Sequence, residues 1–327
     1  IKRKEIPSGT GIAAHLLRRI AMKYQPEGSL LDMPENLAAQ SSLSTLRSAM
    51  ERESLLEGRA LVCDSGHNLL VDLNGIRGII PREECAIGIS DGSVRDIAIL
   101  SRVNKPVCFV VTGIGIDRYG EPEVRLSRRL AQENCRGEYI EKLRPGDIIP
   151  FRVTHLERFG AFVDIGCGIV SLIPIDAISV SRISHPKDRF FVGEEIYAVV
   201  RSMENGRITM SHRELLGTWE ENAAAFAPGE TVAGVVRSVE DYGIFVELTP
   251  NLAGLAEKKE GVRPGQQASV FIKSLLPEKM KVKLILIDAF DGEPYLPKLT
   301  YFKKSGHMDH WVYSTPSCSR VIETVFD

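Results

Sequence analysis

Alternating hydrophobic and polar residues predict short β-strands through much of the chain. In the stretch RITMS, which follows Asn205-Gly206, polar side chains at positions 207, 209 and 211 alternate with Ile208 and Met210. This period of two is typical of a half-buried strand. Asn-Gly between two such strands predicts a two-residue hairpin turn with both residues at positive φ. Similar strands, separated by glycine, proline and asparagine, recur at about five to a unit, which favours small closed barrels over a layered α/β fold.

The chain repeats itself, and an internal repeat sets the architecture of a protein. The segment ERFGAFVDIGCGIVSLIP, residues 157–174, closely matches EDYGIFVELTPNLAGLAE, residues 240–257. Both consist of glutamate, any residue, an aromatic residue, glycine, any residue, phenylalanine, valine, an acid and an aliphatic residue. The two segments therefore predict two copies of one barrel.

A fainter copy precedes these two. When the Val-Asp pair that begins at Val71 is aligned with the pair that begins at Val163, His67 and Leu70 fall where the later copies have aromatic residues. The first repeat therefore keeps the framework of the unit and lacks the aromatic pair.

These patterns predict a mainly β protein made of three tandem five-stranded barrels joined by short helices. Ser211 and Glu214 have the spacing of a capping box, so a helix is expected to begin where the second barrel ends. The predicted segments are a partly helical N-terminal segment at 1–54, a degenerate first barrel at 55–130, a helical linker at 131–143, a second barrel at 144–215, a helical linker at 216–228, a third barrel at 229–290 and a small β-rich C-terminal extension at 291–327.

Two aromatic residues three positions apart mark each of the later repeats. In a regular strand, Phe159 and Phe162 would point to opposite faces. Gly160 follows the first of them directly, and a glycine inside a strand commonly marks a bulge, which brings positions i and i+3 onto one face. The sequence therefore predicts a pair of rings on one side of the sheet, and a second pair at Tyr242 and Phe245.

Paired rings on a sheet surface are a platform on which bases stack, at about 1–3 kcal/mol per base, without a basic overall charge. The alternative is that the rings fill the core, as an isolated phenylalanine in a strand usually does. Two features weigh against it: Ala161, Val163 and Ile165 already supply an inward-facing row, and the pattern occurs twice.

The net charge of the chain is −2, so no bulk basic surface is expected. The simplest indication of nucleic-acid binding, a strongly basic protein, is therefore missing. Residues 142–216 contain 10 Lys and Arg against 9 Asp and Glu, a difference of +1, and residues 227–290 contain 8 of each. Electrostatic binding of RNA is therefore expected to be weak and only mildly salt-dependent.

Other chemistry has little support in the sequence. The six cysteines are scattered without a CxxC pair, which indicates reduced, mostly buried residues of a cytoplasmic protein. There is no apolar run of membrane-spanning length, no signal peptide, no P-loop and no nucleophile elbow, so no catalytic residue and no cofactor are predicted. His307 and His310 lack further ligands at metal-site spacing, so no metal site is predicted. Residues 301–313, YFKKSGHMDHWVY, mix aromatic and basic residues and are a less favoured accessory nucleic-acid surface.

The stretches FGAFVDIG and NGRITMSHREL resemble the RNA-binding repeat of small-subunit ribosomal protein S1, a five-stranded barrel of the oligonucleotide-binding (OB) fold. The resemblance covers about residues 55–290 as three units. It implies the OB fold for each unit and single-stranded RNA as the usual ligand.

The resemblance also implies roles for particular residues. In the second unit, Phe159 and Phe162 match the stacking aromatics, and Arg207 matches the basic residue of the last strand. In the third unit, Tyr242 and Phe245 match, and Lys281 stands near the position of the arginine.

Three positions depart from the family pattern. In the second unit, Pro174 stands where the family has a histidine, and Met203 stands where it has an acid. In the third unit, Glu257 replaces the histidine. Both second-unit departures weaken the expected hydrogen bonding, and an acid at 257 would repel phosphate, so the third surface ranks second. In the first unit, the corresponding positions are His67, Leu70, Pro81 and Glu123, so that unit is expected to be structural or a protein-contact module.

The function predicted from the sequence is non-catalytic binding of single-stranded RNA by a protein of the ribosomal S1 type. It would hold mRNA near the small ribosomal subunit, in the cytoplasm. Two alternatives remain open: an RNA-binding regulator that acts away from ribosomes, and barrels that serve as protein-interaction modules. The last of these predicts that a helix or a neighbouring repeat covers the aromatic pairs.

Overall fold

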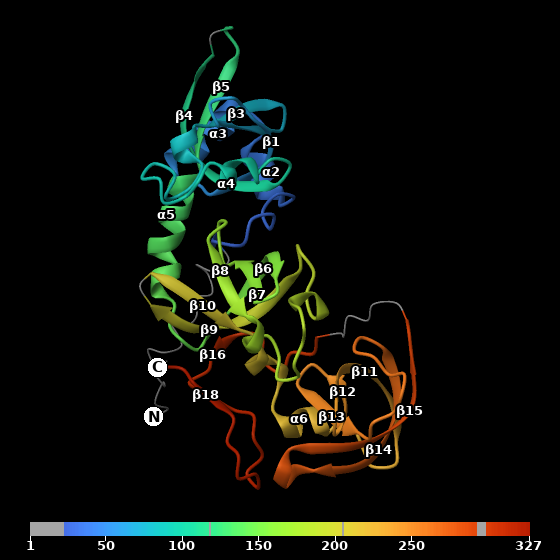
Figure 1. Cartoon of the computed structure of the whole chain (residues 1–327). Helices are drawn as coiled ribbons and strands as arrows, with labels where there is room; N and C mark the ends of the chain where they lie inside the picture. Colours follow the sequence, from blue (N-terminus) through green and yellow to red (C-terminus); the bar gives the residue numbers. More distant parts are fainter. Residues whose placement is uncertain (1–22, 118, 205, 293–298) are drawn as a thin grey trace, which may run out of the picture. The chain divides into compact units, whose positions relative to one another are not determined.

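The protein is mainly β in the computed structural model, which describes residues 23–117, 119–204, 206–292 and 299–327 (Figure 1). The chain forms two compact units. The first comprises Ile1–Leu143 and the loop Asp164–Val170, and the second comprises Arg144–Val163 and Ser171–Asp327. Three five-stranded barrels lie along the chain, so the predicted fold class is confirmed.

The first barrel is closed, with strand order β1-β2-β3-β5-β4. Its elements are α2 (Pro34–Ala39), α3 (Leu43–Glu51), β1 (Leu56–Cys63), β2 (Leu69–Leu73), β3 (Ile76–Ile80), η1 (Arg82–Glu84), α4 (Ile97–Leu100), β4 (Pro106–Ile116) and β5 (Pro122–Ser127). Leu46 of α3 packs with Leu69, Leu73 and Phe109 in its core, and all four are fully buried. The predicted helical N-terminal segment thus supplies part of that core. The linker that follows contains α5 (Arg128–Glu138) and η2 (Ile140–Lys142).

Two buried carboxylates hold the irregular lead-in before α2 in the first unit. Glu27 pairs with Arg128, with Nε 2.6 Å from Oε1 and Nη2 3.0 Å from Oε2. Glu57 accepts hydrogen bonds from the backbone N–H groups of Gly28 and Leu30. Burial is the main cause that raises the pKa of Glu57 to about 7, and the charge of Glu27 adds to the effect.

The second barrel has the order β6-β7-β8-β10-β9 and closes through pairing of β6 with β9. Its elements are β6 (Asp147–Glu157), β7 (Gly160–Asp164), β8 (Val170–Pro174), η3 (Ile175–Ala177), η4 (Pro186–Asp188), β9 (Glu195–Glu204) and β10 (Arg207–Ser211). The predicted hairpin joins β9 to β10, and Gly206 has φ 73°. Asn205 lies outside the described residues.

The connection between the second and third barrels differs from the prediction in one respect. Ser211 does hydrogen-bond to the Glu214 carboxylate, but only a short 3-10 turn, η5 (Arg213–Leu216), follows it. The α-helix α6 (Trp219–Ala223) begins later, and its capping box consists of Thr218 and Glu221. The predicted box was therefore wrong for the α-helix, because Gly217, with φ 84°, interrupts the helical backbone.

The third barrel is closed, with strand order β11-β12-β13-β15-β14. Its elements are β11 (Thr231–Glu240), β12 (Gly243–Thr249), β13 (Leu252–Ala256), β14 (Gln267–Leu276), η6 (Pro277–Lys279) and β15 (Lys281–Phe290). In its described residues, 291–292 and 299–327, the C-terminal extension adds three short strands, β16 (Gly306–His307), β17 (His310–Val312) and β18 (Glu323–Val325). Of these, β16 pairs with β6, and β17 pairs with β18.

Within the second unit, side chains of both barrels form one core. Ile148 and Val199 of the second barrel belong to the same buried cluster as Val236 and Val270 of the third. The fully buried Asn251 adds hydrogen bonds across this junction. Its Nδ2 donates to the carbonyls of Arg213 and Gly217, at 2.8 Å each, and its Oδ1 accepts from Val180 N at 3.0 Å.

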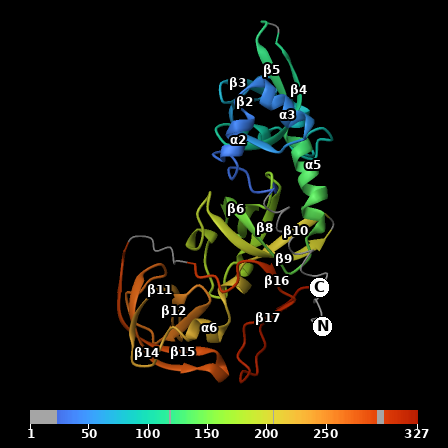
Figure 2. The ribbon, with the colours of Figure 1, turned by 180° about the vertical axis from the view of Figure 1, so that it is seen from behind.

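The C-terminal extension is packed into the same core (Figure 2). Trp311 and Tyr313 are buried there, so these two rings of the stretch 301–313 are not available to a base. Tyr301 Oη lies 3.0 Å from Nε2 of the buried His212, whose Nδ1 lies 2.8 Å from Ile178 O. Burial is the main cause that lowers the pKa of His212 to about 4.

Candidate nucleic-acid interface

The two predicted rings of the second barrel lie together on its surface. Phe159 is 57% exposed, and Phe162 is half-buried. Their ring centroids are 5.9 Å apart, and the rings meet edge to face at 89°. Ala161 and Val163 point into the barrel and are fully buried. The core is therefore filled by the inward-facing row, and the two rings lie outside it.

A hairpin turn brings the two rings together, so the predicted bulge at Gly160 was wrong. β6 ends at Glu157 and β7 begins at Gly160, which leaves Phe159 in a two-residue turn with Arg158. Phe162 lies two residues beyond Gly160 on β7, on the outer face. Strand alternation is not violated, because Phe159 is not part of a strand.

Glycine is needed after each turn because a neighbouring strand comes very close. A Cβ atom on Gly160 would lie 2.4 Å from the carbonyl oxygen of Ile173. A Cβ atom on Gly243 would lie 2.5 Å from the carbonyl oxygen of Ala256, and Gly243 also has φ 151°. The recurring aromatic-Gly pair is therefore a ring in a tight turn followed by a residue that can have no side chain.

The third barrel repeats the arrangement with Tyr242 and Phe245. Tyr242 is 70% exposed, and the ring centroids are 6.1 Å apart at 87°. A bulge does occur here, but on the partner strand β11, where the register shifts between Val236 and Ser238. The extra residue, Arg237, donates a hydrogen bond to Glu247, with Nε of Arg237 2.8 Å from Oε2 of Glu247.

The bulged residue Arg237 belongs to a buried cluster of charged side chains within the second unit. Arg237 and Arg189 both contact the Glu247 carboxylate, and the side chain of Arg189 is fully buried. Nε of Arg189 also donates to Ser179 Oγ at 3.2 Å. Burial is the main cause that lowers the pKa of Arg189, while the charge of Glu247 opposes the shift. These charged groups are therefore structural.

His155 extends the aromatic surface of the second barrel. Its ring is stacked on that of Phe162, with centroids 6.1 Å apart at 28°, and its Nε2 lies 2.7 Å from Glu157 Oε1. The sequence did not distinguish His155 from other histidines. The repeat offers the available signal for the place of His155 beside Phe162. In the alignment of the two repeats, His155 corresponds to Ser238, and Ser238 pairs directly with Phe245.

The last strand of the second and third barrels supplies basic residues to the sheet that carries these rings. Arg207 is exposed at the start of β10, and no ion pair joins it to another part of the chain that the structure describes. In the third barrel, Phe245 pairs with Leu255, and Leu255 pairs with Lys283. Lys283 thus lies in the same row as Phe245, whereas the predicted Lys281 lies one row further along β15.

The sequence analysis missed Lys283, although a signal for it exists. Lys281, Val282 and Lys283 alternate in polarity, so the two lysines are expected on one face, and in the structure both are exposed while Val282 is buried. The row that contains Lys283 could not be deduced, because it depends on the parallel pairing of β13 with β15.

The first barrel has three aliphatic residues and an arginine in the equivalent row. Val62 pairs with Leu70, Leu70 pairs with Ile79, and Ile79 pairs with Arg125. His67 lies in a longer loop before β2 and has φ 62°. No pair of rings is therefore present at this position of the first barrel.

The second and third barrels differ in charge at the hairpin turn. Next to Phe159, Arg158 is exposed. Next to Tyr242, Asp241 is exposed and lies 3.4 Å from Lys258, and Glu257 is exposed directly after the neighbouring strand, β13. The residue beside the first ring is therefore basic in the second barrel, and it is an acid paired with a lysine in the third.

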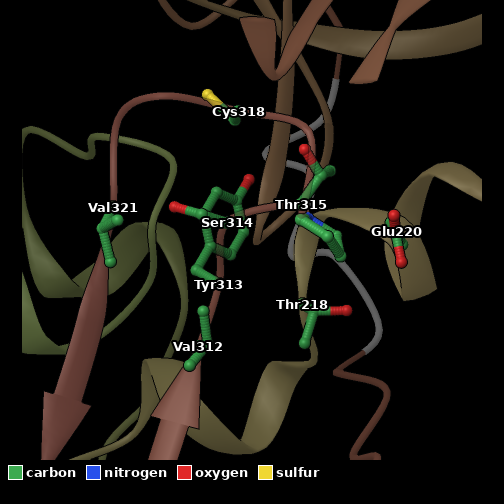
Figure 3. Close-up of a pocket in the computed structure, with 9 residues that line it drawn as sticks. Thr218, Glu220, Val312, Tyr313, Ser314, Thr315, Cys318 and Val321 are labelled. Atoms are coloured by element: carbon green, nitrogen blue, oxygen red, sulfur yellow. The ribbon is translucent and has the colours of Figure 1, made fainter. Parts of the chain in front are cut away.

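A surface hollow of about 390 Å³ lies elsewhere, on the C-terminal extension (Figure 3). Tyr313, Thr315 and Cys318 line it together with Thr218 and Glu220. None of the predicted RNA-binding residues lines this hollow. Among residues 23–117, 119–204, 206–292 and 299–327, no group of three or more His, Cys, Asp or Glu side chains is arranged to hold a metal ion. In the same part of the chain, no helix is long and apolar enough to span a membrane.

One stretch of the chain matches a known domain family, and a larger part is similar to named relatives. Residues 142–213 match the family model of the S1 RNA binding domain. Small ribosomal subunit protein bS1 of Leuconostoc lactis is 30% identical over 234 residues, which cover 66% of this chain and 52% of the relative. The bS1 protein of Staphylococcus haemolyticus is 27% identical over 300 residues, which cover 85% of this chain and 73% of the relative.

The chain thus spans about half the length of the first of these relatives. Among solved structures, a multidomain protein with nucleic acid binding domains from Streptococcus pneumoniae is 15% identical and covers 72% of this chain and 74% of its own. Its TM-score is 0.24. The predicted resemblance to ribosomal protein S1 is confirmed by the domain match and by the bS1 relatives.

Proposed function

We propose that this protein binds single-stranded RNA on the ring pairs of its second and third barrels. It would act without catalysis, in the cytoplasm, and hold mRNA near the small ribosomal subunit. The observation that carries the proposal is the recurrence of one aromatic pair, with one exposed and one half-buried ring, at the same turn of two barrels. Exposed rings are suited to stack on unpaired bases, because every base has an aromatic face.

The exposure of these rings favours RNA over the protein-module alternative. That alternative requires a helix or another repeat to cover the aromatic pairs. In the part of the chain that the structure describes, Phe159 and Tyr242 are more than half exposed. The bS1 relatives support a role at the ribosome, and co-sedimentation with small subunits distinguishes it from the action of a free regulator.

The test is binding of a fluorescein-labelled uridine oligonucleotide, measured by fluorescence anisotropy. The double variant Phe159→Ala, Phe162→Ala is expected to weaken binding by about 10- to 100-fold, because each stacked base contributes about 1–3 kcal/mol and the third barrel still binds. The matched control is Tyr119→Ala, which removes an exposed ring from the first barrel. Unchanged affinity in the double variant would show that bases do not stack on this pair.

A further inference from the structure

The charged residues around the ring pair of the third barrel are unevenly distributed. Asp241 and Glu257 lie at the end where Tyr242 stands. Lys281 and Lys283 lie on β15, whose exposed face alternates with buried residues. The turn end of this surface therefore carries mixed charge, with Lys258 paired to Asp241, whereas the β15 end carries two exposed lysines that attract phosphate.

The strand register places the lysines relative to the rings. Phe245, Leu255 and Lys283 form one row across β12, β13 and β15. Because neighbouring strands lie about 4.8 Å apart, the Cα atom of Lys283 is roughly 10 Å from that of Phe245, with Leu255 between them. Lys281 stands one row further, about 7 Å along the strand. A base on Phe245 would thus have its backbone over Leu255, within reach of Lys283.

The acidic residues occupy a different row. Glu257 follows Ala256, which pairs with Ile244, so Glu257 lies level with the turn that carries Tyr242. Glu257 therefore lies about 7 Å along the strand from the row of Phe245, and its repulsion acts most strongly at the turn end of the surface.

The second barrel has no such separation. Thr209, which pairs with Leu172, stands where the third barrel has Lys283. Two of its exposed cations, Arg158 at the turn and Arg207 at the start of β10, stand at opposite ends of the surface. Both of its rings are therefore flanked by positive charge.

We propose that Lys283, together with Lys281, binds the RNA backbone on the third barrel, and that Phe245 rather than Tyr242 is the principal stacking ring there. This assignment rests on the proposed function. It makes the third barrel bind at the lysine end of its surface, whereas the second barrel uses both of its rings.

The experiment uses the full chain carrying Phe159→Ala and Phe162→Ala, so that binding of the labelled uridine oligonucleotide reports the third barrel. In this background, Lys283→Met is expected to weaken binding about fivefold and to reduce the slope of log K against log salt by about 0.7, the value for one phosphate contact on a single strand. Lys105→Met is the matched control, because it removes the same charge from an exposed position on the first barrel.

Separate alanine substitutions of Phe245 and Tyr242 test which of the two rings is the principal stacking ring. Phe245→Ala is expected to weaken binding at least about fivefold more than Tyr242→Ala does. Asp241→Asn is expected to strengthen binding about twofold, since it removes a repulsive charge. A larger loss for Tyr242→Ala, or equal effects of Lys283→Met and Lys105→Met, would overturn the assignment.

Failure of the proposed function would look different. If removing both Tyr242 and Phe245 rings left binding in this background unchanged, the third barrel would not stack bases at all. If Phe245→Ala weakened binding while Lys283→Met did not, RNA binding by the rings would stand and only the phosphate assignment would fall. Complete loss of binding in the background would also overturn the assignment, because the third barrel would then not bind alone.

Discussion

The first and second barrels share one strand order but differ at the hairpin between their first two strands. In the first barrel, β1 and β2 are joined by a five-residue loop, 64–68, in which Asp64 Oδ1 accepts hydrogen bonds from Gly66 N and Asn68 N at 2.8 and 2.9 Å. In the second barrel, the turn has two residues, Arg158 and Phe159, and Gly160 follows directly.

This difference separates the requirements of the fold from those of the surface. Both barrels close, so neither the short turn nor the aromatic pair is needed for closure. The short turn of the second barrel, however, places Phe159 beside Phe162 on the outer face. In the longer loop of the first barrel, Asp64 accepts hydrogen bonds from backbone N–H groups, and no ring stands at the equivalent place. The ring pair is thus a property of the turn, added to a framework that does not depend on it.

The largest expected effect tests how tightly the short turn is packed. Gly160→Val is expected to lower the free energy of unfolding of the second unit by about 3 kcal/mol, because its Cβ would lie 2.4 Å from the Ile173 carbonyl oxygen. Both tryptophans, Trp219 and Trp311, lie in that unit, so urea unfolding followed by tryptophan fluorescence reports it. Thr231→Val is the control, because it places a valine at an exposed strand position of the same unit. An equal effect of both substitutions would show that the close approach does not constrain the turn.

A smaller effect distinguishes the two units, because their free energies of unfolding are expected to change with pH in opposite directions. His212 has a pKa lowered to about 4 in the folded second unit, from 6.5 when unfolded. The unfolded state therefore binds more protons as the pH falls, and stability that is present above pH 6.5 is lost on acidification. The loss is about 2 kcal/mol between about pH 7.5 and about pH 5, measured by the same fluorescence assay. In His212→Gln this part of the pH dependence should disappear.

Glu57 gives the first unit the opposite dependence. Its pKa is raised to about 7 in the folded state, so the stability it contributes is full below its unfolded value of 4.5 and is lost as the pH rises through 7. The expected loss is about 1.5 kcal/mol between about pH 5.5 and about pH 7. Hydrogen exchange of the β1 and β2 amides measures it. Stability that falls in the same direction in both units would contradict the contrast.

The smallest effect concerns the surface of the first barrel. Leu70→Phe restores one ring at the position of Phe162, but the longer loop supplies no second ring. RNA affinity is therefore expected to stay within about twofold of that of the unmodified protein in the anisotropy assay. A gain of tenfold or more would show that a single ring suffices and that the turn does not decide where RNA binds.

Much of this architecture could be predicted from local sequence. Alternation and turn residues gave the strands, because side-chain faces and hairpin geometry depend on residues close together in the chain. The repeat at 157–174 and 240–257 gave the common barrel and marked Phe159 and Phe162 as unusual. The role of Gly160 was not accessible in this way, because the atom that excludes a side chain is the carbonyl of Ile173, on another strand.

The sequence by itself determined that the chain forms repeated β-barrels and that two repeats carry an aromatic residue, a glycine and a second aromatic residue. The tertiary structure alone decided which residues share a row, as Phe245 does with Lys283. It also decided that Asn251 and Trp311 belong to a junction of the second and third barrels. The physical reason is that rows and shared cores depend on the register and packing of strands far apart in sequence, which local alternation does not specify.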